Sequence, residues 1–177
     1  MHIIPGYSMM AATATTFMLS IIFLLLSEQS KKQYMRFWGI SWLVYSAMFL
    51  LDFCHLNWDF IYLGYVMLRQ MLALLGAYTF LLGTHHFFQT KYPASLGFAA
   101  ILSTISMSLY PAISPVYTLM IIPNIIFSSG LLIYSGCMFI AISWTQKLPE
   151  KLIASFLIIL WSIFINHFAF SLKNQQL

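Results

Sequence analysis

Charged residues are scarce in this sequence. Of its 177 residues, 8 are Lys or Arg and 4 are Asp or Glu, so charged side chains make up 7% of the chain. An ordinary soluble domain carries about 25%, and so few charges cannot cover a water-soluble protein of this size. Hydrophobic residues make up 61%. The composition excludes most cytoplasmic enzymes, nucleic-acid-binding proteins and disordered regulators, and it predicts a membrane protein.

Motifs of catalysis are also missing. The sequence contains no Gly-rich phosphate loop, no His-Glu-x-x-His, no Gly-x-Ser-x-Gly and no closely paired carboxylates. With four acidic residues in all, general acid–base chemistry has few candidate groups. We therefore predict that the chain is not an enzyme by itself, has no catalytic residues and needs no cofactor, and that nucleic acid is not a partner.

Cysteine and histidine give little support for a metal or redox site. Cys54 and Cys137 are the only cysteines, and we place them in opposite leaflets, too far apart for a disulfide. His55 and His167 could meet near the outer surface, but nothing in their spacing requires it. The adjacent His85 and His86 point about 100° apart on a helix. We predict no metal site, and a haem-binding or redox protein stays as a third reading.

Long apolar runs are the main positive feature. A transmembrane helix needs roughly 20 mainly apolar residues, and these runs are continuously apolar rather than alternating, which favours helices over a β-barrel. We predict an all-α integral membrane bundle, a single transmembrane domain over residues 1–177. Its six helices are expected at 8–27, 37–54, 60–87, 94–110, 116–144 and 152–171.

The positions of the basic residues predict the orientation. Positive residues are enriched in cytoplasmic loops. The loops after the first, third and fifth runs hold six of the eight basic residues, and the two other loops hold none. These six are Lys31, Lys32, Arg36, Lys91, Lys147 and Lys151. We therefore expect the N-terminus outside the cytoplasm, with the first apolar run retained as a helix.

Arg69 is the most informative single residue, because it lies inside the third apolar run. A charge within the membrane is costly and normally faces the bundle interior, where it is paired or hydrated. Asp52 is the nearest candidate counter-ion and Asp59 is the second choice. Two readings stay open: a ligand pocket in the outer half of the membrane, or a structural ion pair that joins two helices. The candidate pocket consists of Asp52, Arg69, Gln70, Asn124, Asn166 and His167.

Glycine and proline refine the expected helices. Gly76 and Gly83 in the third run, and Gly130 and Gly136 in the fifth, would permit close approach of neighbouring helices. Pro123 is expected to kink the fifth helix, because it removes one backbone hydrogen bond. No repeat is visible that would indicate duplicated halves, which weakens a transporter reading.

Four segments resemble a known group of membrane regions. They are Arg36-Phe-Trp-Gly-Ile-Ser-Trp-Leu-Val-Tyr-Ser46, Leu68-Arg-Gln, Leu81-Leu-Gly-Thr-His-His-Phe-Phe88 with Lys91-Tyr-Pro, and Ile159-Leu-Trp-Ser-Ile-Phe-Ile-Asn-His167. Together they are similar to the N-terminal multi-helix sensor region of bacterial sensor histidine kinases and diguanylate cyclases. The resemblance extends from about residue 30 to residue 170.

This resemblance implies a sensory module in a bacterial inner membrane. Such a module would detect a ligand or a membrane state and pass the signal to a cytoplasmic kinase or cyclase output domain or partner, and a homodimer is possible. We expect the chain to depart from this pattern by lacking the last helix and the output domain, either as a truncated or degraded sensor or as a free-standing bundle that acts on a partner. The alternative function is a small membrane transporter or channel subunit, in which the same polar residues line a permeation path.

Overall fold

The structure is a computed structural model of the 177-residue chain. It describes residues 3–57, 62–91, 97–98, 102–103, 105–106, 109, 117–146, 153 and 155–160. Apart from the connecting residues 31–32 and 88–91, all of these residues are helical. The prediction of an all-α protein is therefore confirmed for this part of the chain. Two compact units are present, Met1–Asn124 and Ile125–Leu177. A single domain over residues 1–177 stays a prediction.

Four long helices are described. They are α1 (Ile3–Ser30), α2 (Gln33–Asn57), α3 (Tyr62–Phe87) and α5 (Tyr117–Gln146). They coincide with the first, second, third and fifth apolar runs, and α1 and α2 extend beyond those runs at both ends. The fourth and sixth expected helices, 94–110 and 152–171, lie largely outside the described residues, although the few residues described within them are helical.

Three of these helices have the length and apolar composition of membrane spans. The candidate spans are Tyr7–Ser30, Gln33–Cys54 and Gly64–Phe87, and a shorter apolar segment is Ile126–Ile142. This finding supports the membrane protein that the composition predicts. The count of six spans and the outside location of the N-terminus stay predictions.

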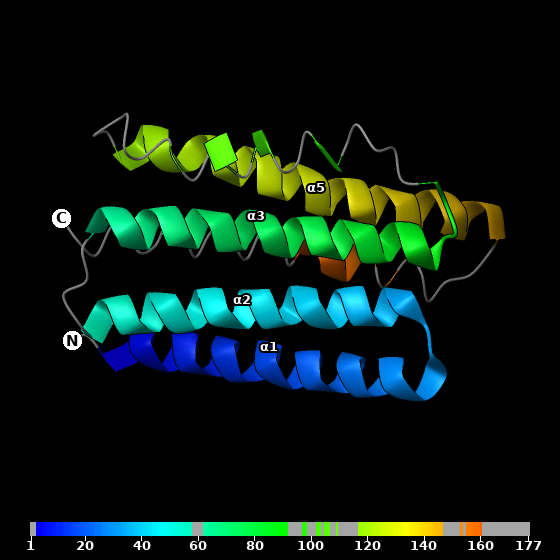
Figure 1. The fold of residues 1–177 in the computed structure, drawn as a ribbon, viewed down its shortest axis with the longest axis horizontal. Coiled ribbons are helices and arrows are strands. Elements are labelled where there is room, and N and C mark those ends of the chain that lie inside the picture. Colours follow the sequence, from blue (N-terminus) through cyan, green and yellow to red (C-terminus); the bar gives the residue numbers. More distant parts are fainter. Residues whose placement is uncertain are drawn as a thin grey trace. The chain divides into compact units, whose positions relative to one another are not determined.

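Helices α1, α2 and α3 form an up–down–up arrangement, with α2 between the other two (Figure 1). The turn from α1 to α2 contains only Lys31 and Lys32. Lys31 ends α1 by adopting a left-handed backbone conformation (φ 56°), and its amide donates to the carbonyl of Ser27 at 2.9 Å. At the same end of the bundle, the Tyr34 and Phe87 rings lie 4.9 Å apart, which places the start of α2 beside the end of α3.

This arrangement gathers positive charge at one end of the three-helix group. The basic residues near that end are Lys31, Lys32, Arg36 and Lys91. Arg69 is the one other basic residue within the described ranges, and it lies inside α3. The first two of the three connections expected on one side of the membrane therefore lie at one end of this group; the third, with Lys147 and Lys151, lies outside the described residues.

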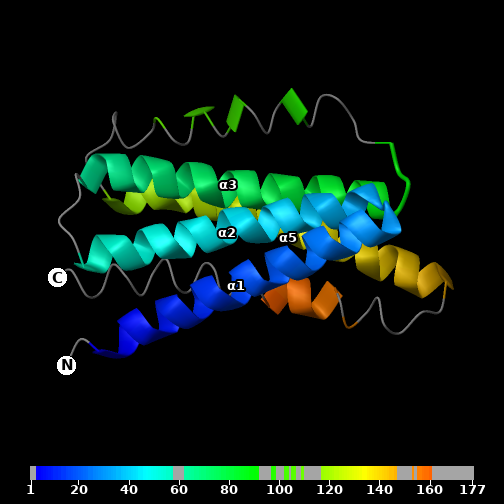
Figure 2. The same cartoon turned by 60° about the horizontal axis from the view of Figure 1, so that its bottom comes forward.

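Small side chains let α1 approach α2. The buried side of α1 carries Thr16 and Ser20, each 1% exposed. The Thr16 hydroxyl donates to the carbonyl of Ala12 in its own helix at 2.7 Å, so its polar group needs no partner on α2. Near the turn the helices pack tightly, because Gly39 faces the Leu24 side chain and a Cβ there would lie 2.8 Å from Leu24 Cγ. From this point the helices diverge toward the start of α1 (Figure 2).

Helices α2 and α3 are held together by a hydrogen bond and by close packing at a glycine. The Ser41 hydroxyl of α2 donates to the carbonyl of Gly76 on α3 at 2.8 Å, with both groups buried. A Cβ at Gly76 would lie 3.0 Å from the buried Tyr45 ring. The prediction that Gly76 permits close helix approach is confirmed.

An aromatic cluster around Trp38 joins all three helices at the basic end. The Trp38 ring meets Phe23 of α1 edge-on at 5.8 Å between centroids, and it stacks on Phe80 of α3 at 5.9 Å. Tyr34 adds an edge contact at 5.1 Å. Gly83 makes room for the indole, because a Cβ at this position would overlap Cδ1 of Trp38. Gly83 also acts as predicted.

Helix α5 continues without interruption through Pro123. Whether its axis bends there stays a prediction. In the second unit, a Cβ at Gly136 would lie 3.2 Å from Cγ1 of Ile159, which confirms a packing role for this glycine. Gly130 is different, because no described atom lies within 4 Å of the place that its Cβ would take. The expectation of close packing at Gly130 is therefore wrong for the described part of the chain.

The Trp38 cluster predicts a difference between two glycines of α3. Gly83→Ala should lower the free energy of unfolding by about 1–3 kcal/mol, because the added methyl overpacks against the indole. Gly64→Ala is the matched control, since no described atom lies near its Cβ position. It should raise stability by up to about 1 kcal/mol through helix propensity. Unfolding by SDS in mixed micelles, followed by circular dichroism, measures both; equal effects would contradict the packing.

Candidate functional site

A buried ion pair joins α2 to α3 near the end opposite the basic residues. Arg69 Nε donates to Asp52 Oδ1 at 2.9 Å. The Asp52 side chain is completely buried and that of Arg69 is 10% exposed. Asp52 lies five residues before the end of α2 and Arg69 seven residues after the start of α3. Because the two helices are antiparallel, the residues reach the same depth, and the predicted pairing is confirmed.

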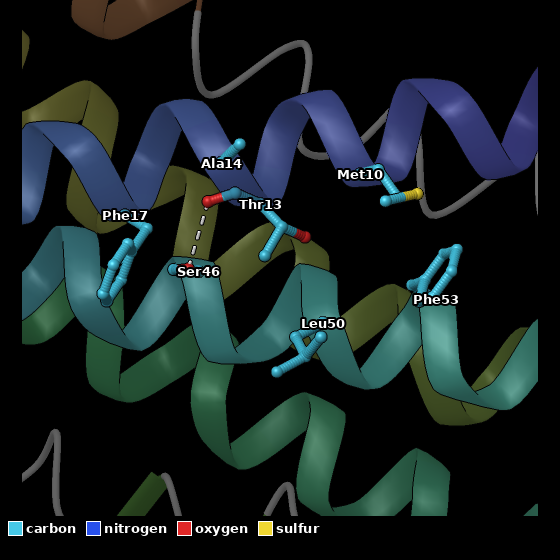
Figure 3. Close-up of a pocket in the computed structure, with 7 residues that line it drawn as sticks. All are labelled: Met10, Thr13, Ala14, Phe17, Ser46, Leu50 and Phe53. Carbon is cyan, nitrogen blue, oxygen red and sulfur yellow. Dashed lines mark hydrogen bonds between the residues drawn. The ribbon is translucent and has the colours of Figure 1, made fainter.

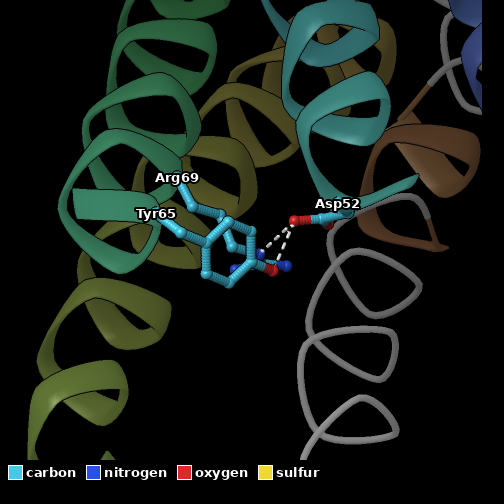
Figure 4. A network of polar contacts seen from close by, with 3 residues as sticks. All are labelled: Asp52, Tyr65 and Arg69. Carbon is cyan, nitrogen blue, oxygen red and sulfur yellow. Dashed lines mark hydrogen bonds and ion pairs between the residues drawn. The ribbon is translucent and has the colours of Figure 1, made fainter. Parts of the chain in front are cut away.

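Tyr65 completes the cluster. Its hydroxyl donates to the same oxygen, Asp52 Oδ1, at 2.8 Å. Tyr65 and Arg69 are four residues apart, so they occupy one face of α3, one turn above the other. Figure 4 shows both side chains reaching from α3 toward the carboxylate on α2. Asp52, Tyr65 and Arg69 are called the Asp52 cluster below.

The arrangement suits a charge pair removed from water. Two unit charges buried without partners are costly, and attraction offsets the desolvation only where the geometry is good and further hydrogen bonds are made. Here the arginine supplies the opposite charge, and the tyrosine supplies a neutral donor to the same acceptor. Loss of any one of the three would leave a buried polar group with fewer partners than it needs.

The second carboxylate oxygen has a different environment. Asp52 Oδ2 is buried and accepts no hydrogen bond from the described residues. A buried carboxylate oxygen without a donor costs free energy, of the order of 1–3 kcal/mol for a polar group. The cluster therefore retains one strong acceptor that a hydrogen-bond donor or a cation would satisfy.

The other predicted pocket residues are not brought to this cluster by the described structure. Gln70 is buried, but it follows Arg69 directly and therefore leaves α3 in a direction about 100° away. Asn124 lies on α5, and its side chain is outside the described residues. Asn166, His167 and the second-choice counter-ion Asp59 also lie outside them.

Tyr65 is the residue that sequence reasoning missed. The available signal was its position four residues before Arg69, because a side chain one turn away on the same helix face can share a partner. Aromatic residues near the ends of membrane helices are common, so Tyr65 did not stand out by type alone.

A second polar contact lies at the basic end. His85 is buried, and its Nδ1 is 2.7 Å from the Thr90 hydroxyl oxygen. The Thr90 amide also donates to the His85 carbonyl at 3.1 Å, which closes the end of α3. In the described part of the chain, no three His, Cys, Asp or Glu side chains are placed to hold one metal ion. Cys54 and Cys137 are free cysteines.

Comparison with protein families, with curated proteins and with solved structures finds no match to this sequence. The resemblance to bacterial sensor regions therefore stays a prediction that depends on the quoted motifs.

The Asp52 cluster predicts that a single variant and a double variant differ strongly in their free energy of unfolding. Arg69→Leu should lower the free energy of unfolding by about 3–5 kcal/mol, because it leaves the Asp52 charge buried without its partner. The double variant Asp52→Leu with Arg69→Leu should regain most of this loss, since no buried charge then remains. Unfolding in mixed micelles measures both variants.

The control is the exposed ion pair between Glu28 and Lys31, whose nearest atoms are 3.8 Å apart and whose side chains are 80% and 83% exposed. Glu28→Gln should leave stability unchanged, because exposed pairs are screened by water. A double variant no more stable than Arg69→Leu would contradict the assignment of the cost to an unpaired charge.

Proposed function

We propose that this chain is the membrane-embedded sensory part of a signalling system and that it reads its input at the Asp52 cluster. The observation that supports the proposal is a buried carboxylate that bridges two apolar helices and keeps one acceptor oxygen, Oδ2, without a donor among the described residues. Charged residues inside membrane spans commonly mark functional sites. The chain itself is proposed to be non-catalytic.

The cluster suggests how an input would act on the helices. A donor-bearing ligand or a cation at Asp52 Oδ2 would compete with Arg69 and Tyr65 for the carboxylate charge. Weaker contacts to Oδ1 would loosen the connection between α2 and α3 at this end. A ligand shifts a conformational equilibrium only by its differential affinity for the two states, and here that difference arises at one oxygen atom.

The proposed orientation places the output at the basic end. Lys31, Lys32, Arg36 and Lys91 gather there, and positive residues favour the cytoplasmic side. The proposal therefore puts the N-terminus outside, six spans in a bacterial inner membrane, and a cytoplasmic kinase or cyclase partner beside the Trp38 cluster. A homodimer would be compatible with this arrangement.

Transport receives less support from the described residues. A permeation path needs polar groups that face it at successive depths through both leaflets. The hydroxyls of Thr79 and Thr84 in α3 instead donate to carbonyls of their own helix, Leu75 O at 2.8 Å and Phe80 O at 3.0 Å. These two side chains therefore have their hydrogen bonds satisfied without a permeant solute.

The orientation makes a prediction that labelling can check. In a variant with Cys54 and Cys137 replaced by Ser, a single cysteine at Lys32 or Gln89 should react with an impermeant maleimide only after the cells are opened. A single cysteine at Tyr7, near the start of α1, should react in intact cells. Labelling of the Lys32 position in intact cells would reverse the proposed topology.

The sensory role predicts that output depends on the Asp52 cluster. In cells carrying the chain at its own locus, Arg69→Leu should abolish the change in kinase phosphorylation or cyclic di-GMP level on stimulation. Tyr65→Phe keeps the ion pair. It should change the stimulus level that gives a half-maximal response by about tenfold, equivalent to about 1.4 kcal/mol. Membrane abundance of each variant is measured alongside.

Glu28→Gln is the control and should respond like the parent protein. Unchanged output from both cluster variants at normal abundance would overturn the sensory assignment. Solute uptake by proteoliposomes containing the purified chain, lost in Arg69→Leu, would instead favour transport.

A further inference from the structure

A groove lies between α1 and α2 on the side where the helices diverge. It has a volume of 380 Å³ and is lined by Met10, Thr13, Ala14, Phe17, Ser46, Leu50 and Phe53. The first four occupy one face of α1 at helical spacing, and the last three occupy one face of α2. Figure 3 shows these side chains around the gap between the two helices.

The two hydroxyl groups of the groove are satisfied internally. Thr13 Oγ1 donates to the carbonyl of Met9 at 2.9 Å, and Ser46 Oγ donates to the carbonyl of Thr13 at 3.2 Å. The second of these bonds crosses from α2 to α1 (Figure 3). The remaining lining residues are apolar. The groove therefore presents hydrocarbon surface and requires no polar partner.

The groove opens at the apolar outer surface of the candidate spans. Met10 is 53% exposed, Phe17 47% and Leu50 51%. All three lie within segments long and apolar enough to cross a membrane, where the surrounding medium is lipid hydrocarbon. The groove also runs along the helices, in the direction that acyl chains take in a bilayer.

We propose that the α1–α2 groove is a binding site for one acyl chain of a membrane phospholipid. Its size agrees with this occupant. An apolar cavity of about 150 Å³ holds one benzene molecule, and the groove has a volume of 380 Å³. It therefore holds a segment of one chain, whereas a complete phospholipid with two chains and a headgroup is too large.

A helix from a second copy fits less well. The seven-residue rise from Met10 to Phe17 is about 10 Å, so 380 Å³ corresponds to a cross-section of about 38 Å². A helix with its side chains is about 10–12 Å wide, which gives a cross-section of roughly twice that or more. The groove is therefore wide enough for a hydrocarbon chain and too narrow to enclose a helix, so a second copy could enter it only with one row of side chains.

Photolabelling tests the site. The full chain is reconstituted in vesicles of phosphatidylethanolamine and phosphatidylglycerol that contain a phosphatidylcholine with a diazirine on one acyl chain. After illumination, labelled residues are mapped by mass spectrometry. We expect labelling to concentrate on the two groove faces, and Ala14→Leu should reduce it about fivefold, equivalent to about 1 kcal/mol, because the larger side chain fills the groove.

Ala11→Leu is the matched control. Ala11 is also exposed and lies on α1, but it does not line the groove. This variant should keep the parent labelling pattern, and equal circular dichroism spectra show that both variants fold. Uniform labelling along α1, or an equal loss in both alanine variants, would overturn the proposal.

A second copy in the groove would also overturn it. With Cys54 and Cys137 replaced by Ser, Ala14→Cys should give no disulfide-linked dimer on oxidation in the same vesicles. Efficient dimer formation at this position, absent for Ala11→Cys, would identify another chain as the occupant. These tests change no residue of the Asp52 cluster, so failure of the groove proposal can be told apart from failure of the proposed sensory role.

Discussion

The Asp52–Arg69 pair is the constraint on which the arrangement of α2 and α3 depends. Both charges lie within apolar helices, and neither tolerates burial alone. The pair therefore fixes which turns of the two helices face each other. The contact of Trp38 with Gly83 fixes the facing turns at a second place. Trp38 lies fourteen residues before Asp52 on α2, which is about 21 Å along the helix. With one polar and one steric anchor at opposite ends, α3 can neither slide along α2 nor rotate freely against it.

Helix α1 is attached to α2 by contacts of a different kind. No ion pair joins the two in the described part of the chain; the Phe23–Trp38 ring contact, the Gly39–Leu24 contact and the bond from Ser46 to Thr13 hold them together. In Figure 2 the two helices separate toward the start of α1. The groove lies between the two helices in the part where they separate.

Hydrophobic runs and charge placement sufficed to predict three membrane-length helices and the partner of Arg69. Apolar runs mark hydrocarbon thickness rather than helix ends, which explains why α1 and α2 continue beyond them into polar flanks such as Gln33. Asp52 could be predicted as the partner of Arg69 because residues at the same depth of two antiparallel helices face each other. Tyr65 could have been predicted only from its position one turn before Arg69 on α3. The groove was beyond sequence reasoning, because it depends on the angle between α1 and α2. No residue type encodes that angle directly.

The ion pair and the groove are mechanically related because they use adjacent residues of α2. Asp52 points to α3 and Phe53 lines the groove beside α1, as expected for neighbours about 100° apart on a helix. A rotation of α2 that moves Phe53 into or out of the groove must also move Asp52 relative to Arg69. At hydrogen-bond distances, a shift of less than 1 Å changes the strength of that contact substantially. What fills the groove between α1 and α2 therefore bears on how firmly α2 is held to α3.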